Sequence, residues 1–336
     1  MTEIPHPRES TSLFGHEAAE GQFRTALASG RMHHAWLICG PKGIGKATLA
    51  YHAARLLLAP TGDERVLRRI MVGSHTDMLV LEPLVDEEKD ETKREISVEQ
   101  ARTAGGFLSL TPAEGDWRVV IADSVDEMNA NAANALLKVL EEPPPRSVLL
   151  LVSHNPGRLL PTIRSRCRSL KLPPLSNEAF HQALRLHAPD IDDAEVEKLA
   201  ILSRFSPGMA LTLHSHEGLE LYADFVRLAG QGGSAMALAD RIAGGQAHAN
   251  WLILARLIAR FFERACELGL RQADFAEIVP GEETACRALL ATMPVHAIAE
   301  LHARAAEQFS VAARLHLDYK TVLITFLQSM HRPQAA

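Results

Sequence analysis

The sequence predicts an α/β fold built on a parallel sheet, followed by all-helical regions, and three observations support this. Short continuous apolar runs alternate with helix-like segments in the first half of the chain, as expected for parallel strands covered on both faces. One of these runs leads directly into a glycine-rich turn. After residue 176 no convincing strand follows and helical spacing continues. With 336 residues, the chain can form two or three domains.

Three strands are expected in the first half, over residues 35–39 ("AWLIC"), 117–122 ("WRVVIA") and 147–153 ("SVLLLVS"). The first leads into an alanine- and leucine-rich helix over 47–59. The second precedes the helical stretch "NANAANALLKVLEE", which must end at the three prolines that follow it. The strand–helix alternation is what a parallel sheet requires.

The remaining segments are read from their patterns alone. The charge run over 85–95, "VDEEKDETKRE", has no apolar period and indicates a solvated loop. Apolar stripes over 250–267 and 309–329 indicate helices that pack against other helices.

Composition narrows the class of protein. No stretch approaches the roughly 20 apolar residues of a membrane span, and the polar start "MTEIPHPRESTS" lacks the layout of a signal peptide. We therefore expect a cytoplasmic protein without a membrane partner. The net charge of −6 argues against a broad basic face that binds nucleic acid alone, but is compatible with membership of a DNA-bound complex. The four cysteines are scattered without CxxC spacing and support neither a disulfide framework nor a zinc ribbon.

The turn after the first strand follows the phosphate-loop pattern G-x-x-x-x-G-K-[ST] except at its last position. Its candidate nucleotide-binding residues are Gly40, Gly43, Gly45, Lys46, Ala47 and Thr48. In such loops backbone N–H groups cradle the phosphates, the lysine adds charge, and the final hydroxyl binds Mg²⁺. Ala47 stands where that hydroxyl belongs and cannot bind a metal. Thr48 is rotated about 100° around the helix and does not simply replace it.

The acidic half of a hydrolytic site is expected at the end of the second strand. Asp123 occupies that position, but Ser124 follows where a glutamate would activate water. The tempting pair Asp126 and Glu127 lies three residues further on, and we interpret it as ordinary surface charge. Ala47 and Ser124 are therefore two independent departures that affect the same reaction, hydrolysis of the nucleotide.

Four stretches together resemble one known family. They are "FGHEAAEGQFRTALASGRMHHAWLICGPKGIGKATLA", "ISVEQAR", "NANAANALLKVLEEPP" and "PTIRSRCRSLKLPPL", and they are similar to the clamp-loader ATPases of bacterial DNA polymerase III, which are AAA+ proteins. The resemblance is strong over residues 10–210 and weak beyond. It implies an AAA+ module of the P-loop type with a degenerate nucleotide site over 1–174, a small helical lid domain over 175–212, and an all-helical collar for oligomerisation over 213–336.

The resemblance also assigns a role to the Ser-Arg-Cys motif, here Ser165, Arg166 and Cys167. In that family the arginine projects into the ATP site of the neighbouring subunit. A guanidinium suits this role, because it stays charged and offers a planar fork of donors to the oxygens that gain charge during phosphoryl transfer. The alternative is that Arg166 makes a local salt bridge.

Two departures from the family sharpen the interpretation. The segment 59–77 contains no cysteine where such proteins usually carry a four-cysteine zinc module, so we predict no zinc, and His75 alone is no site. The arginine that senses nucleotide in the family is expected near "SPGMAL" and is replaced by Met209. The residues leave open whether ATP or ADP still binds weakly.

The resemblance implies a largely ATPase-silent accessory subunit of a DNA-directed DNA polymerase holoenzyme. Such a subunit supplies Arg166 to a neighbour and helps load the sliding clamp onto primed DNA. Its partners would be motor subunits of the gamma/tau type and a delta subunit in a heteropentamer, the sliding clamp, and primer–template DNA through the complex. Two alternatives stay open: an active ATPase motor, in which Thr48 and Glu127 take over the missing roles, and a nucleotide-sensing adaptor that works alone.

Overall fold

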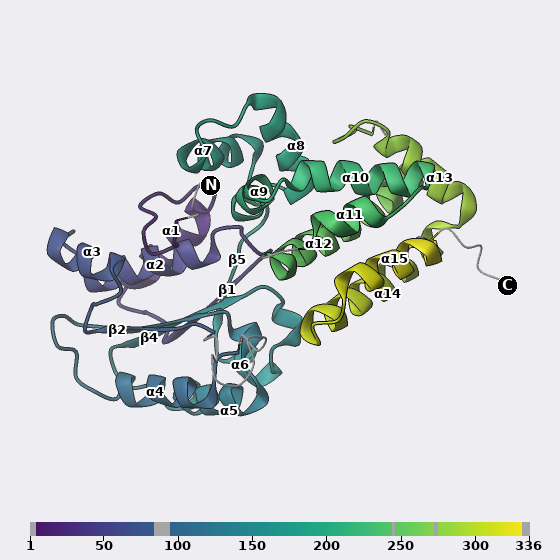
Figure 1. Cartoon of the computed structure of the whole chain (residues 1–336). Coiled ribbons are helices and arrows are strands. Elements are labelled where there is room, and N and C mark those ends of the chain that lie inside the picture. Colours follow the sequence, from purple (N-terminus) through teal and green to yellow (C-terminus); the bar gives the residue numbers. More distant parts are fainter. Residues whose placement is uncertain (1–4, 84–94, 244–245, 272–274, 331–336) are drawn as a thin grey trace. The chain divides into compact units, whose positions relative to one another are not determined.

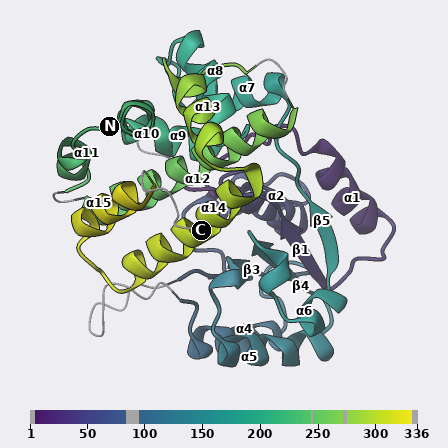
Figure 2. The ribbon, with the colours of Figure 1, turned by 90° about the vertical axis from the view of Figure 1, so that its right-hand side faces the viewer.

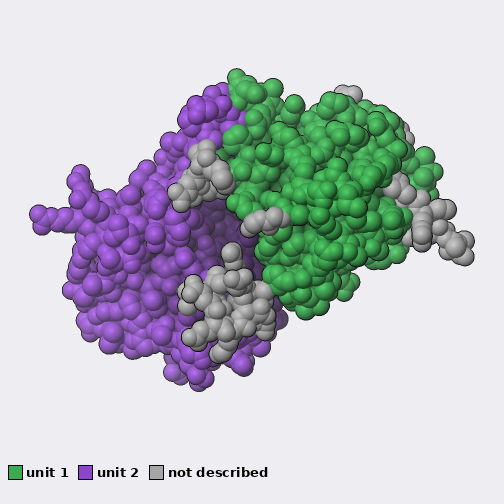
Figure 3. Space-filling view, in the orientation of Figure 1, with its two compact units in different colours: residues 1, 192–204, 210–336 green, residues 2–191, 205–209 purple. Residues whose placement is uncertain are grey.

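The structure is a computed structural model that describes residues 5–83, 95–243, 246–271 and 275–330. Most of the expected loop over 85–95 lies outside the described residues. The chain divides into two compact units, one formed by residues 2–191 and 205–209 and the other by 192–204 and 210–336 (Figure 3). The domain boundaries expected at 174 and 212 stay a prediction, and helix α9 (Pro207–Ser215) runs through the second of them.

The first unit is built on a sheet of five parallel strands in the order β2-β3-β4-β1-β5. The strands are β1 (Ala35–Cys39), β2 (Met78–Leu81), β3 (Arg118–Asp123), β4 (Ser147–Ser153) and β5 (Arg168–Lys171). Every residue of the central strands β1 and β4 is buried, which explains their continuous apolar runs. The three expected strands are confirmed.

The sequence did not predict β2 and β5, and their position explains why. Both are edge strands of four residues. In β5 only Leu170 is buried, and its other residues are polar and exposed. A strand of four residues gives no long apolar run, and β5 also has a solvated side.

Helices cover both faces of this sheet (Figures 1 and 2). Helix α2 (Lys46–Leu58) covers one face, and α4 (Val98–Leu108) and α5 (Ala130–Glu141) lie side by side on the other. The rest of the unit's helical elements are α1 (Glu17–Ala28), α3 (Glu64–Met71), η1 (Val125–Glu127), η2 (Pro156–Arg158), α6 (Pro161–Ser165) and α7 (Asn177–His187).

Local signals fix the ends of α4 and α5. Ser97 and Gln100 form a reciprocal capping box at the start of α4. The side chain of Asn129 caps α5 by accepting from Ala132 N. The prolines after Glu142 end α5, because proline cannot continue the hydrogen-bond ladder. The sequence thus places the C-terminal end of α5 firmly.

The second unit is all-helical as far as it is described. Its helices are α8 (Asp193–Ser203), the later part of α9, α10 (Gly218–Gln231), α11 (Met236–Arg241), α12 (Ala247–Arg271), α13 (Glu282–Thr292), α14 (Val295–Arg314) and α15 (Tyr319–Met330). The stripe over 250–267 lies within α12. The stripe over 309–329 is not one helix, because α14 ends at Arg314 and His316 adopts a positive φ of 47°. None of the described helices combines the length and apolar character that crossing a bilayer requires.

A buried polar network ties together three helices of the second unit. The carboxylate of Glu282 accepts from Tyr222 Oη at 2.6 Å, from Ile278 N at 2.7 Å and from Arg264 Nη2 at 3.1 Å, and Arg264 Nε also contacts it. Glu282 and Tyr222 are fully buried and Arg264 nearly so. The charge is thus fully paired, as a buried carboxylate requires.

Candidate functional site

The glycine-rich loop between β1 and α2 has the geometry expected of a phosphate loop. Gly43 has a φ of 78° and Gly45 a φ of 102°, values that L-amino-acid side chains rarely adopt. At Gly40 a Cβ atom would lie 2.6 Å from the carbonyl oxygen of Leu172. Each of these glycines is therefore required by the backbone, and the predicted strand–loop–helix order is confirmed.

The side chain of Lys46 hydrogen-bonds to the backbone of its own loop. Its side chain is buried, and Nζ donates to the carbonyl oxygens of Gly40 at 2.8 Å and Pro41 at 2.5 Å. Burial lowers the pKa of Lys46 to about 8, although the nearby carboxylate of Asp123 opposes the shift. To meet a phosphate, this ammonium would have to exchange its carbonyl partners.

The turn at residues 206–209, which includes the first residues of α9, lies directly on the loop, within the same unit. Ser206 Oγ donates to the carbonyl oxygen of Lys42 at 2.8 Å, and Gly208 N donates to that of Gly43 at 2.9 Å. A Cβ atom on Gly43 would lie 2.6 Å from Met209 N. The backbone of Met209, the residue at which the sensor arginine was expected, therefore lies beside the loop.

Asp123 ends β3 next to the loop in a site that disfavours its charge. Burial, followed by repulsion from Glu82, raises the pKa of Asp123 to about 6, and the Lys46 ammonium only partly offsets this. Ser124 beside it is buried, and its hydroxyl has no partner among the described residues. A serine hydroxyl at this place is no general base for a water nucleophile.

The interpretation of Asp126 as ordinary surface charge is wrong, because its carboxylate is hydrogen-bonded to residues at the end of β4. Its carboxylate accepts from Ser153 Oγ at 2.8 Å, from Asn155 N at 3.3 Å, and also from His154 N. It thereby ties the segment after β3 to the end of β4. No local pattern predicted these contacts, because the partners lie 27 or more residues away and only the strand order brings them together.

The chemistry left at the loop is incomplete. Ala47 and Thr48 lie in the first turn of α2, both partly buried, and only Thr48 carries an oxygen. Among the residues that the structure describes, no group of three or more His, Cys, Asp or Glu side chains could hold a metal ion. The predicted absence of zinc in the protein stays a prediction. His75 is buried and accepts from Asp77 N at 3.1 Å, which gives it a local structural role.

The Ser-Arg-Cys motif lies at the end of α6, where Arg166 is the C-cap. Arg166 Nη1 donates to Thr162 O at 3.0 Å, and Nη2 lies 2.9 Å from Glu141 Oε1. The guanidinium thus makes a local salt bridge while its side chain stays 35% exposed. Ser165 Oγ donates to Thr162 O at 3.1 Å, and Cys167 packs against the core, where burial raises its pKa to about 12. Arg166 finds its partners on α5 and α6, not on the loop of its own chain.

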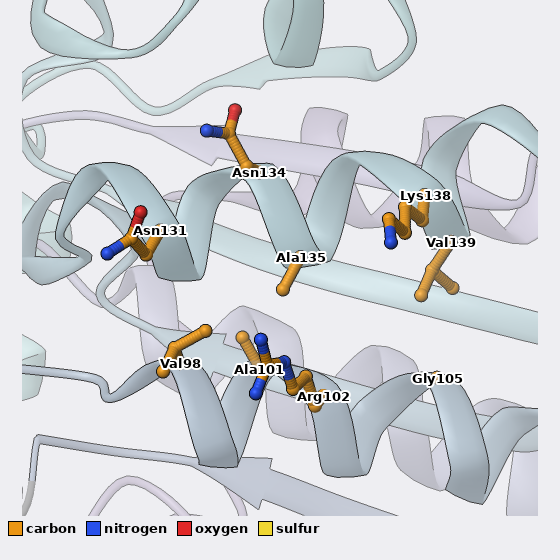
Figure 4. Close-up of a pocket in the computed structure, with 9 residues that line it drawn as sticks. All are labelled: Val98, Ala101, Arg102, Gly105, Asn131, Asn134, Ala135, Lys138 and Val139. Atoms are coloured by element: carbon orange, nitrogen blue, oxygen red, sulfur yellow. The ribbon is translucent and has the colours of Figure 1, made fainter.

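A groove that the sequence did not predict lies between α4 and α5 (Figure 4). Its cavity of about 400 Å³ is lined by Val98, Ala101, Arg102, Gly105, Asn131, Asn134, Ala135, Lys138 and Val139. These residues include two cations and no carboxylate. The groove arises only when two helices about 30 residues apart in sequence pack together, which periodicity within one helix does not reveal.

Sequence comparisons match this chain over part of its length. The sequence model of a family described as "DNA polymerase III, delta subunit" matches residues 15–176. The DNA polymerase III subunit delta' of Pseudomonas aeruginosa is 40% identical over 200 residues, which are 57% of this chain and 59% of that protein. The subunit delta' of Bacillus subtilis is 33% identical over 165 residues, 47% of this chain and 48% of that protein. The chain spans less than two-thirds of the length of either relative.

Gamma and tau subunits of DNA polymerase III are also similar to this chain. DNA polymerase III subunit tau of Escherichia coli is 30% identical over 210 residues, 60% of this chain and 31% of that protein. Among solved structures, a DNA polymerase III gamma subunit-related protein from Thermotoga maritima aligns over 94% of this chain and 99% of its own, with a TM-score of 0.46 and 17% identity. Residues 15–176 thus match the DNA polymerase III delta-subunit family, and the chain is similar to bacterial clamp-loader subunits over that segment and its relatives' aligned residues.

Proposed function

We propose that the chain is a delta-prime-like clamp-loader subunit, largely silent as an ATPase, that supplies Arg166 to the ATP site of a neighbouring motor subunit. One observation carries the proposal. The positions that would bind Mg²⁺ and activate water in its own nucleotide site hold Ala47 and Ser124, whereas Arg166 is present and partly exposed at the end of α6.

The loop geometry supports catalytic silence. Efficient phosphoryl transfer needs a positioned metal ion, a positioned water and a charge clamp on the phosphates. Here the lysine of the clamp is bound to two carbonyl oxygens of its own loop, and the turn at 206–209 is hydrogen-bonded to the loop backbone. Weak binding of ATP or ADP without turnover is compatible with this proposal.

The partners follow from the family. Because relatives are named as delta', gamma and tau subunits of DNA polymerase III, we propose assembly with gamma/tau-type motors and a delta subunit into a heteropentamer. The sliding clamp and primer–template DNA are the substrates of the whole complex. The helices of 213–336 would form the collar, and the complex would work in the cytoplasm.

A turnover assay of the isolated chain tests the silent site. We expect negligible ATP hydrolysis. A rate near 1 s⁻¹, about the lower end for efficient phosphoryl-transfer enzymes, that disappears in Lys46→Ala would instead identify an active motor subunit. In that case Thr48 and Glu127 would have to supply the missing metal ligand and base.

The role of Arg166 is tested in a complex reconstituted with the gamma- and delta-type subunits of the same organism. Arg166→Ala should leave folding and assembly intact and lower the DNA- and clamp-stimulated ATPase several-fold. The full 10³ to 10⁵ of an arginine finger, an order-of-magnitude range, would not be seen, since one of several motor sites is served. Arg166→Lys should rescue only in part, because an ammonium loses the fork. Arg164→Ala removes the exposed arginine two positions earlier and should change little; equal effects of both variants would refute the assignment.

A further inference from the structure

The guanidinium of Arg166 is held at two points by its own chain. Glu141 Oε1 lies 2.9 Å from Nη2, and Thr162 O accepts from Nη1 at 3.0 Å. Thr162 belongs to the same short helix as the motif, but Glu141 is the last residue of α5. The orientation of the arginine therefore depends on a second element.

The two elements that hold Arg166 are fixed to each other. Leu140 of α5 and Ile163 of α6 are both buried and belong to the same hydrophobic cluster beneath the sheet. Each stands next to a residue that contacts the guanidinium, Leu140 beside Glu141 and Ile163 beside Thr162. Functional side chains are best oriented by partners on rigid, packed elements, and this arrangement meets that condition.

Glu141 brings no benefit to its own helix. A carboxylate in the last turn of a helix faces the negative end of the helix dipole and is locally unfavourable. The contact with Arg166 offsets this cost. Glu142, the adjacent carboxylate, is also exposed and forms the C-cap, and the ion pair described for Arg166 is with Glu141.

Arg166 can keep both partners and still reach a ligand. A guanidinium has five N–H donors, and the two contacts use one on each terminal nitrogen. The Nε–H group and one N–H on each terminal nitrogen remain, and the side chain is 35% exposed. The contacts with Glu141 and Thr162 therefore leave three N–H donors of the guanidinium available to a phosphate oxygen.

We infer that Glu141 is a positioning residue for Arg166: its carboxylate holds the guanidinium in the orientation in which it meets the ATP of the neighbouring subunit. This inference rests on the proposed function, because it presupposes that Arg166 acts across a subunit interface. Glu141 itself touches no reacting atom.

The test uses the reconstituted clamp loader and compares Glu141→Ala, Glu141→Gln, Arg166→Ala and the double variant Glu141→Ala/Arg166→Ala. Glu142→Ala is the matched control. The stimulated kcat and the KM for ATP are measured for each complex, and thermal unfolding of each free chain checks that it folds.

We expect Glu141→Ala to lower kcat about two- to five-fold, the scale of an exposed ion pair, with KM for ATP unchanged. Glu141→Gln should retain part of the rate, because its amide oxygen still accepts an N–H. Glu142→Ala should match the parent chain. The double variant should equal Arg166→Ala alone, since Glu141 acts only through that arginine.

The outcomes separate the two claims. A normal rate with Arg166→Ala removes the arginine finger, and with it the proposed function. A reduced rate with Arg166→Ala but a normal or raised rate with Glu141→Ala overturns the positioning role and leaves the finger in place. Effects that multiply in the double variant also overturn it, because Glu141 would then act independently of Arg166.

Discussion

Replacing Asp123 by asparagine is expected to stabilise the first unit at neutral pH, because the site disfavours the charge that this residue carries there. The pKa of Asp123 is about 6 in the folded chain and close to the ordinary 3.8 when unfolded. Below about pH 4 both states hold the proton, so its contribution is complete there. As the pH rises from about 4, the unfolded carboxylate loses its proton while the folded one keeps it, so this stability falls and is fully lost once the pH has passed the folded-state pKa of about 6.

The size of the effect follows from the shift. About two pKa units correspond to roughly 3 kcal/mol at most. Asp123→Asn also removes a carboxylate that favours the charged form of Lys46, which reduces the gain. We therefore expect the free energy of unfolding to rise by about 1–2 kcal/mol above pH 7 and to match the parent chain near pH 4.

The assay is amide hydrogen exchange of β3 and β4 between pH 4 and 8, corrected for the intrinsic exchange rate at each pH. This readout reports the unit that contains Asp123 even if the two units unfold separately. Asp126→Asn is the matched control and should destabilise, because its carboxylate accepts from Ser153 Oγ and two backbone N–H groups. If Asp123→Asn gave no gain at pH 7.5, or a gain that grew toward pH 4, the reasoning from burial would be refuted.

Three further predictions concern the loop, the buried network and zinc. Gly43→Ala should destabilise by about 1–3 kcal/mol and release the turn at 206–209, because its Cβ would lie 2.6 Å from a backbone nitrogen; unchanged exchange of that turn would contradict this. Glu282→Ala should lower the free energy of unfolding by about 3–5 kcal/mol in chemical denaturation, because it leaves the charge of Arg264 buried without a carboxylate partner. Tyr222→Phe should lower it by only about 1 kcal/mol. Equal losses of stability in the two variants would be inconsistent with the network. Elemental analysis should find no stoichiometric zinc, and about one zinc per chain would overturn that expectation.

The sequence predicts those elements of the fold that depend on one local property of the chain. Strands 35–39 and 147–153 match β1 and β4 because fully buried parallel strands are apolar throughout. The loop followed from glycines whose positive φ values the backbone requires.

The sequence does not predict contacts or helix ends that depend on residues distant in the chain or on a change in backbone direction. The role of Asp126 depends on β4 lying beside β3. The pairing of Arg166 with Glu141 depends on α5 packing near α6. The stripe over 309–329 keeps its apolar spacing across a turn at which the helix stops, so periodicity alone overlooked the break.

The two edges of the sheet limit how copies of this module can associate. An unpaired strand edge is a template for adding another strand, and proteins discourage this with short edges and charged side chains. Both β2 and β5 have only four residues, and β5 exposes Arg168 and Lys171. The Arg168 guanidinium also lies over the Trp36 ring, 4.9 Å from its centroid. Extension of the folded sheet from one molecule into the next is therefore disfavoured, which favours contacts between neighbours through helices and loops over contacts through strand edges.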